Sequence, residues 1–309
     1  MSLPKHTSPL RLFLSYSILL VSMATLVACG GAAQEKIPGD EGGAEAEDSG
    51  AETVETTRQI FHYVPTPVES SSLLERSGAD YNADLLNAIE NVSLYETVSK
   101  KAINLGIYTT DLSYASIYEQ SGEIMVFSAC AKKLSDALGV TEAFSENTLL
   151  RIESNIADKD SILQIITETY YITDTHLKMN QRANLSGLIL AGGWIEGLYI
   201  ASKVIESQPD NQLLVTRLLE QKHSLQNLLI LAGQYSDDVK MQPVLADLRE
   251  MHALFEQVEE RVVSDPTIET DTDGQSTTIN TGRELTASEE TIAMIREKAS
   301  EIRSEYIQP

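Results

Sequence analysis

Two carboxylates stand in stretches that are otherwise apolar, and their types and positions make them the first candidates for chemistry. Glu196 lies within Leu185–Ile205, where nearly every face of a helix would be apolar, and a helix that is apolar all round is buried. Asp111 lies in a second apolar stretch, Leu105–Tyr118. Because a buried carboxylate needs a hydrogen-bonding or charged partner, each acid must meet a polar group inside the fold.

Tyrosine is the polar partner that the composition favours, since the chain has 12 Tyr against 5 Phe. We hypothesise that Glu196 and Asp111 accept hydrogen bonds from tyrosine hydroxyls inside a helical bundle. Such a network would either fix the register of the helices or line a pocket for a small polar ligand. A cavity of about 300 Å³ or more beside Glu196 would favour the pocket. The candidate ligand-binding residues are Asp111, Tyr114, Tyr118, Glu196 and Tyr199.

Other motifs that suggest metal binding or catalysis are incomplete. Glu220 and His223 have the Glu-x-x-His spacing of a di-iron bundle, but the second pair that such a site needs is missing. The run Glu269–Gly274 resembles the opening of an EF-hand calcium loop, whose twelfth position is Asn280 here instead of Glu. No zinc-protease, nucleophile-elbow, phosphate-loop or dinucleotide motif is present. The sequence therefore predicts no catalytic residue, metal or cofactor, and a protein that is not an enzyme.

The first 28 residues have the pattern of a secretory signal peptide. Lys5 and Arg11 precede an apolar run, Leu12–Val27, which is too short and too often broken by Ser and Thr for a membrane span of about 20 apolar residues. The ending Leu26–Cys29 resembles the lipobox of bacterial lipoproteins. That resemblance implies a lipid on Cys29, which becomes the first residue of the mature chain. Gly30, where an Asp would favour the inner membrane, implies an outer-membrane destination.

Residues 29–57 are predicted to form a disordered acidic tether. They are rich in Gly and Ala and carry eight carboxylates between Glu35 and Glu55, so they cannot bury enough apolar surface to offset chain entropy. An alternative is an acidic export signal read by sorting machinery. The net charge of the chain is −23, and removal of the signal takes two bases and no acid and leaves about −25. This charge argues against binding to nucleic acid and to anionic headgroups, so attachment to the membrane must come from acyl chains on Cys29.

Residues 58–309 have the apolar spacing of long helices. Helices are predicted over residues 68–76, 82–91, 95–120, 122–138, 145–156, 158–180, 183–207 and 288–307, with Gly139 as a C-terminal cap. Leu214–Tyr235 and Met241–Val258 alternate steps of four and three across a short connection, which indicates antiparallel neighbours. Asp273-Gly274 predicts the turn of a β-hairpin over residues 267–281, and Thr286–Glu289 has the spacing of a capping box. The predicted fold class is all-α: a multi-helix bundle of long antiparallel helices with a small hairpin near the C-terminus.

The predicted helix over residues 183–207 is unusual because it contains four glycines. Each interior glycine costs about 1 kcal/mol relative to alanine. Close approach of a second helix backbone would offset this loss, as would a bend at Gly192-Gly193. A membrane span is a poor alternative, because Glu196 would lie within the bilayer.

Two segments of the body, Asn104–Tyr114 and Ala191–Glu196, resemble a group of uncharacterised all-helical lipoproteins of Gram-negative bacteria. The resemblance covers most of residues 60–307, supports the helical fold and implies no specific function. We predict a lipid-anchored protein of the cell envelope that is a non-catalytic binding or structural module for an envelope protein. The alternative is a helical bundle that binds a small polar ligand through Glu196, Asp111 and neighbouring tyrosines.

Overall fold

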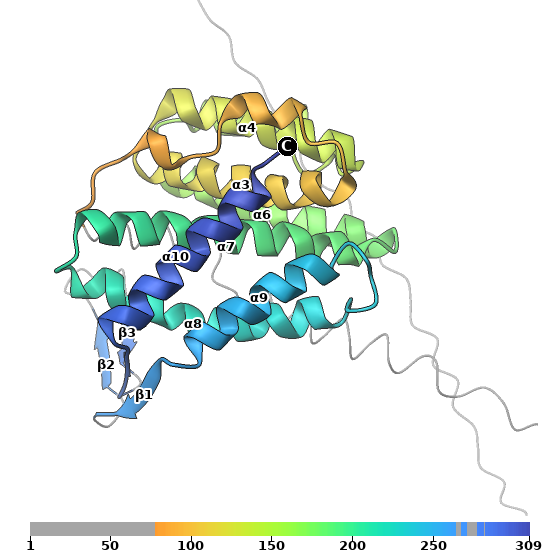
Figure 1. Ribbon diagram of the computed structural model, residues 1–309. Helices are drawn as coiled ribbons and strands as arrows, with labels where there is room; N and C mark the ends of the chain where they lie inside the picture. Colours follow the sequence, from red (N-terminus) through yellow and green to blue (C-terminus); the bar gives the residue numbers. More distant parts are fainter. Residues whose placement is uncertain (1–77, 264–266, 271–276, 281) are drawn as a thin grey trace, which may run out of the picture. The chain divides into compact units, whose positions relative to one another are not determined.

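The computed structural model describes residues 78–263, 267–270, 277–280 and 282–309, which lie in the second of the two units into which the chain divides, Glu47–Pro309. The predicted signal peptide, the lipobox-like ending, the predicted tether, the predicted helix at 68–76 and the predicted turn at Asp273-Gly274 all lie outside the described residues. Within them the chain forms long helices packed antiparallel, with short antiparallel strands near the C-terminus (Figure 1). The predicted fold class is confirmed.

The elements occur in the following order. The described helices are η1 (Ala83–Leu85), η2 (Ile89–Ser93), α3 (Val98–Ile117), α4 (Ser121–Leu138), α5 (Glu146–Ser154), α6 (Lys159–Met179), α7 (Ala183–Ser207), α8 (Gln212–Gly233), α9 (Gln242–Phe255) and α10 (Glu289–Tyr306). The described strands are β1 (Glu259–Val262), β2 (Thr267–Thr270), β3 (Thr277–Asn280) and β4 (Arg283–Thr286). α7 begins and ends at the predicted residues, α8 and α9 are neighbours as predicted, and Gly139 caps α4 with a φ of 72°.

The helix predicted over residues 82–91 is wrong. The two short 3-10 helices η1 and η2 stand there, and the backbone between them is extended at Leu86 and non-helical at Ala88. The apolar spacing is helical, but the main chain bonds elsewhere: the backbone N–H of Asn87 donates to Asp111 in α3 at 3.2 Å. A local pattern cannot reveal such a long-range partner.

Side-chain caps begin several of the helices. Each accepts the backbone N–H three residues on, a group that has no partner within the helix. The caps are Thr97, Ser145, Asp158, Asn211 and Ser288. The capping box predicted at Thr286–Glu289 is wrong in register, because α10 begins after Ser288, whose Oγ accepts the N–H of Thr291 at 3.1 Å.

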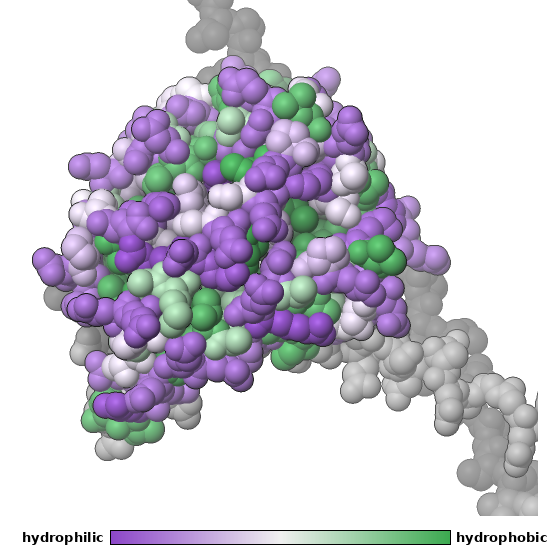
Figure 2. Space-filling model, viewed as in Figure 1, coloured by the Kyte–Doolittle hydropathy of each residue, from purple (hydrophilic) through white to green (hydrophobic). Residues whose placement is uncertain are grey.

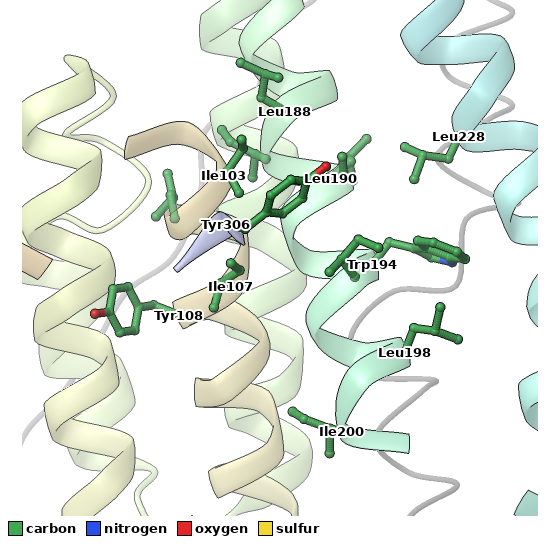
Figure 3. Close-up of a cluster of buried hydrophobic side chains, with 14 of the residues drawn as sticks. Ile103, Ile107, Tyr108, Leu188, Leu190, Trp194, Leu198, Ile200, Leu228 and Tyr306 are labelled. Carbon is green, nitrogen blue, oxygen red and sulfur yellow. The ribbon is translucent and has the colours of Figure 1, made fainter. Parts of the chain in front are cut away.

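The helices α3 and α7 form the centre of the bundle. They share the most extensive helix–helix contact, α4 and α6 pack on α3, and α10 crosses α7 on its way from α9 toward α3. Trp194 points from α7 toward Leu228 of α8 (Figure 3). The core is therefore built around α7, which explains why that helix is apolar on nearly every side.

The close helix approach predicted for α7 is confirmed, and its partner is α3. A Cβ atom on Gly106 would lie 1.9 Å from the carbonyl oxygen of Ile189, and one on Gly192 would lie 2.1 Å from that of Ile103. Such distances are shorter than any van der Waals contact, so the two backbones touch there. At Gly197, by contrast, the nearest atom is 4.0 Å away. Gly106 and Gly192 therefore lie at the contact between the two backbones, whereas Gly197 does not.

Among the described helices, α7 is the one long and apolar enough to cross a bilayer, but 72% of its apolar window is buried inside the bundle, as in a core helix. The face of the molecule in Figure 2 is mostly hydrophilic, with scattered apolar side chains. The apolar surface of α7 is thus covered by other helices of the same chain.

The strands form two short antiparallel pairs, β1 with β4 and β2 with β3. The second pair confirms the strands of the predicted hairpin. The β1–β4 pair was not predicted, because Glu259–Val262 is exposed along its length and lacks the alternation that marks a half-buried strand. A hydrogen bond from Val263 N to Gly282 O, at 2.7 Å, extends this pair toward β2 and β3.

Candidate functional site

A buried ion pair joins α7 to α10. Arg303 Nε donates to Glu196 Oε2 at 2.9 Å, and Arg303 Nη2 donates to Oε1 at 3.0 Å, a two-point geometry that suits a guanidinium and a carboxylate. Glu196 is fully buried, and only 9% of the Arg303 side chain is exposed. The guanidinium also lies over the ring of Tyr199, 4.5 Å from its centroid. The partner of Glu196 is thus a guanidinium, not the tyrosine hydroxyl that the sequence suggested.

Asp111 lies beside this ion pair and is as fully buried as Glu196. Its Oδ2 accepts the backbone N–H of Asn87, whereas Oδ1 is buried and has no hydrogen-bond partner in the structure. Burial and the charge of Glu196 raise the pKa of Asp111 well above its ordinary value, although Arg303 acts in the opposite direction. We therefore expect Asp111 to be protonated, so that its O–H is available to Glu196 and the three side chains together are neutral.

The tyrosines predicted near the acids lie on the same face of α3, but they do not bond to the carboxylates in the way expected. The Tyr114 hydroxyl accepts the backbone N–H of Asn82 at 3.2 Å. The rings of Tyr114 and Tyr118 are 5.0 Å apart, and Tyr81 stacks on Tyr114 at 5.2 Å. Asp111, Tyr114 and Tyr118 thus lie on one face of α3. Glu196 and Tyr199 of α7 both contact Arg303, whose charge also acts on Asp111.

A segment that sequence reasoning missed covers this face. Residues 78–97, called the strap here, run over α3 and α4 (orange in Figure 1). Asn87 holds it from the inside, because its Nδ2 donates to Tyr95 Oη at 3.0 Å and to Asn104 Oδ1 at 3.1 Å. Arg303 Nη2 also donates to the carbonyl oxygen of Leu85 at 3.0 Å. The buried charges therefore connect the strap, α3, α7 and α10.

The end of α10 is tied to the same region. Tyr95 Oη donates to the carbonyl oxygen of Ile307 at 3.1 Å, and Asn104 Nδ2 donates to that of Tyr306 at 2.9 Å. Carbonyl groups at a helix end have no partner within the helix. The strap and α3 supply partners for two carbonyls in this last turn.

A small cavity lies between α6 and α7, lined by Tyr170, Thr173, Asp174, Ser186, Ile189 and Leu190. The space in it that is open to the centre of a water molecule is about 10 Å³, enough for roughly one water. Neither Asp111 nor Glu196 lines it. Within the part of the chain that the structure describes, no three His, Cys, Asp or Glu residues are grouped to hold a metal ion.

No protein-family model, curated protein or solved structure matches this chain. The resemblance to helical lipoproteins therefore stays an expectation drawn from the residues themselves.

Replacement of Asp111 by asparagine tests whether the buried carboxyl is protonated. Because its pKa is raised in the folded protein, its contribution to stability is full below the ordinary carboxyl pKa and is lost as pH rises through the folded-state pKa. We expect the melting temperature of the wild type to fall as pH rises through this window. That of Asp111→Asn should fall less, because asparagine has the shape of the protonated acid and cannot ionise. Circular dichroism during heating, at a series of pH values, measures the difference.

An exposed acid provides the control for this titration. Asp210→Asn removes an exposed carboxyl and should leave the pH dependence of the wild type unchanged. Both variants keep the ionisable groups that interact with Asp111, namely Glu196, Arg303, Cys130, Tyr81 and Tyr108. If Asp111→Asn were less stable than the wild type by the same amount at every pH, folding would not raise the pKa of Asp111.

Proposed function

We propose that this chain is a lipid-anchored protein of the cell envelope, located in the outer membrane, whose helical body binds a partner protein and does not catalyse a reaction. The observation that carries the proposal is the lipobox-like ending Leu26–Cys29 after an apolar run of signal-peptide length. The acidic chain is repelled by anionic headgroups. Two or more acyl chains on Cys29 would supply a stable attachment that the protein surface does not.

The body supports a binding module more than an enzyme. Asp111 and Glu196 are the two acids that the sequence singles out, and both are enclosed by protein atoms with no exposed surface. Glu196 is also fully engaged by Arg303. A substrate or small ligand could reach neither acid without displacing the strap or α10. We therefore favour a protein partner over the small polar ligand.

Metabolic labelling with an alkyne-bearing fatty acid tests the anchor, and crosslinking in the same intact cells tests the partner. We expect labelled wild-type protein in the outer-membrane fraction, crosslinked to an envelope protein. Cys29→Ser should lose the label, the membrane location and the crosslinked partner. Cys130→Ser is the matched control, because it removes the other cysteine, which is buried in α4 with 6% exposure, and should retain all three.

Two results would contradict the two halves of the proposal separately. A wild-type protein that takes up no label would rule out the lipid anchor, and a Cys29→Ser protein that keeps its label would rule out Cys29 as its site. A correctly anchored wild-type protein that is recovered alone after crosslinking would rule out the binding function.

A further inference from the structure

The face of α3 beneath the strap is a continuous polar stripe. Asn104, Tyr108, Asp111, Tyr114 and Tyr118 recur at steps of four and three, which places them on one side of a helix. The first four have no exposed surface, and Tyr118 is half-buried. Helix faces buried in a core are normally apolar. A stripe of hydroxyl, amide and carboxyl groups on the central helix of a bundle therefore needs a polar occupant, and the strap provides it.

The stripe holds the strap mainly through the main chain of the strap. Three contacts recur along it: Asn82 N–H to Tyr114 Oη at 3.2 Å, Asn87 N–H to Asp111 Oδ2 at 3.2 Å, and Tyr108 Oη to Ala88 O at 2.7 Å. Arg303 adds a fourth at Leu85 O. Proteins that bind extended peptides obtain affinity from hydrogen bonds to the main chain of the peptide and specificity from pockets for its side chains.

Two side chains of the strap supply the specificity. Asn87 inserts its amide between Tyr95 and Asn104 and is only 2% exposed. Tyr81 stacks its ring against Tyr114. A segment that presents an asparagine and a tyrosine at this spacing would therefore satisfy the stripe, and the strap is such a segment.

Apart from these contacts, four side chains of the strap are partly buried against the core: Tyr81, Leu85, Leu86 and Val92. The strap contains no α-helix, and Ala79, Asn87 and Tyr95 are its buried residues. Segments with few buried apolar contacts open at low free energy compared with global unfolding. We therefore expect the strap, which has few fully buried side chains, to open at a lower free energy than α3, α4 and α7.

We infer that the stripe of α3, with Arg303, is a peptide-binding groove that the chain fills with its own strap, and that the strap of a second copy takes the same place. Every copy carries a segment that fits, and exchange of an identical element between protomers needs no new surface. The inference rests on the proposed function, because it names the groove and the segment through which the binding module acts. The strap held in cis lowers the affinity for any incoming strap by keeping the groove occupied.

A fluorescent peptide with the sequence of residues 78–97 tests the groove on the purified, full mature chain in detergent. The peptide is tested on the wild-type chain and on its Asn87→Ala variant. This substitution removes hydrogen bonds that hold the strap and leaves the groove residues of α3 and α10 unchanged. We expect the peptide to bind Asn87→Ala about tenfold more tightly than the wild type, since a strap that is held less firmly leaves the groove free more often. Fluorescence anisotropy measures both affinities.

Asn91→Ala is the matched control, because it changes the same residue type in the same strap. The Nδ2 atom of Asn91 makes only long contacts, 3.4 Å to Asn87 Oδ1 and 3.5 Å to Ile307 O, so its peptide affinity should match the wild type. A peptide that itself carries Asn87→Ala should bind at least about tenfold more weakly than the unaltered peptide. Two wild-type copies with different tags should co-purify after incubation, and excess peptide should separate them.

Three results would overturn the inference. If no peptide binds the Asn87→Ala chain, or if the altered peptide binds as well as the unaltered one, the stripe is not a peptide-binding groove. If the peptide binds but the two tagged copies do not co-purify, the second copy is not the occupant. These assays use purified protein without membranes or envelope partners. A negative result in them would therefore contradict the groove alone, and would leave the lipid anchor and the crosslinked partner to be tested in cells.

Discussion

Alanine at Gly106 or Gly192 is expected to lower the free energy of unfolding by about 3 kcal/mol or more, because a well-packed contact cannot accept extra atoms without strain. Each new Cβ would meet a backbone carbonyl oxygen of the facing helix at 1.9 or 2.1 Å. A backbone oxygen in a helix cannot move away as the end of a flexible side chain can. The α3–α7 contact, the most extensive in the bundle, would have to open along its length.

The same substitution at two other glycines of α7 separates steric clash from helix propensity. Gly197→Ala meets no atom closer than 4.0 Å and should be neutral or stabilise by up to about 1 kcal/mol. Gly187→Ala should fall between, because the Cβ would meet Met241 Cε, the end of a flexible side chain, at 2.7 Å. Urea denaturation measures all four variants. A Gly106→Ala protein as stable as Gly197→Ala would show that the two helices are not in backbone contact.

Arg303→Met is expected to cost about 3–5 kcal/mol, the usual consequence of removing one member of a buried ion pair. Methionine keeps much of the length of the side chain but leaves the Glu196 carboxylate buried beside Asp111 without a cation. It also removes the donor to Leu85 O, so the strap should be released more readily. Urea denaturation gives the stability, and hydrogen exchange at residues 78–97 reports the strap.

An exposed arginine pair and a double variant serve as controls. Arg151 pairs with Glu168 at 2.8 Å, but both side chains are about 40% exposed, so Arg151→Met should cost no more than about 1 kcal/mol. Adding Glu196→Gln to Arg303→Met removes the uncompensated charge and should restore part of the lost stability. If Arg303→Met and Arg151→Met were equally mild, the carboxylate of Glu196 would not be isolated from water.

The sequence predicted the type and extent of most helices because apolar periodicity and caps are local signals. The bounds of α7 and the role of Gly139 follow from residues that lie within a few positions of each other. The glycines of α7 indicated that another backbone comes close, but they could not say which one. Gly106 in α3 was not recognised as the partner, because Gly106 and Gly192 are 86 positions apart and their pairing has no local signature.

The candidate site was predicted only in part, for a similar reason. Burial of Glu196 and Asp111 follows from the apolar residues around them, whereas the identity of their partners depends on how distant helices pack. Arg303 lies in a helix with charges on several sides, so it does not stand out. A signal was nevertheless present: Arg303 is four residues after Ala299 and next to Ile302, which places it at the edge of the buried face of α10.

The ties between the end of α10 and the strap have a consequence for the order of events during synthesis. Asn104 and Tyr306 are separated by 202 residues, and Tyr95 and Ile307 by 212, so these bonds form only after nearly the whole body has left the ribosome or the export channel. Contacts of such long range are late and slow in folding. The bonds of the strap to α3 span only 20 to 32 residues, so newly made molecules would pass through a stage in which the strap already lies on α3 and the end of α10 has not yet docked on them.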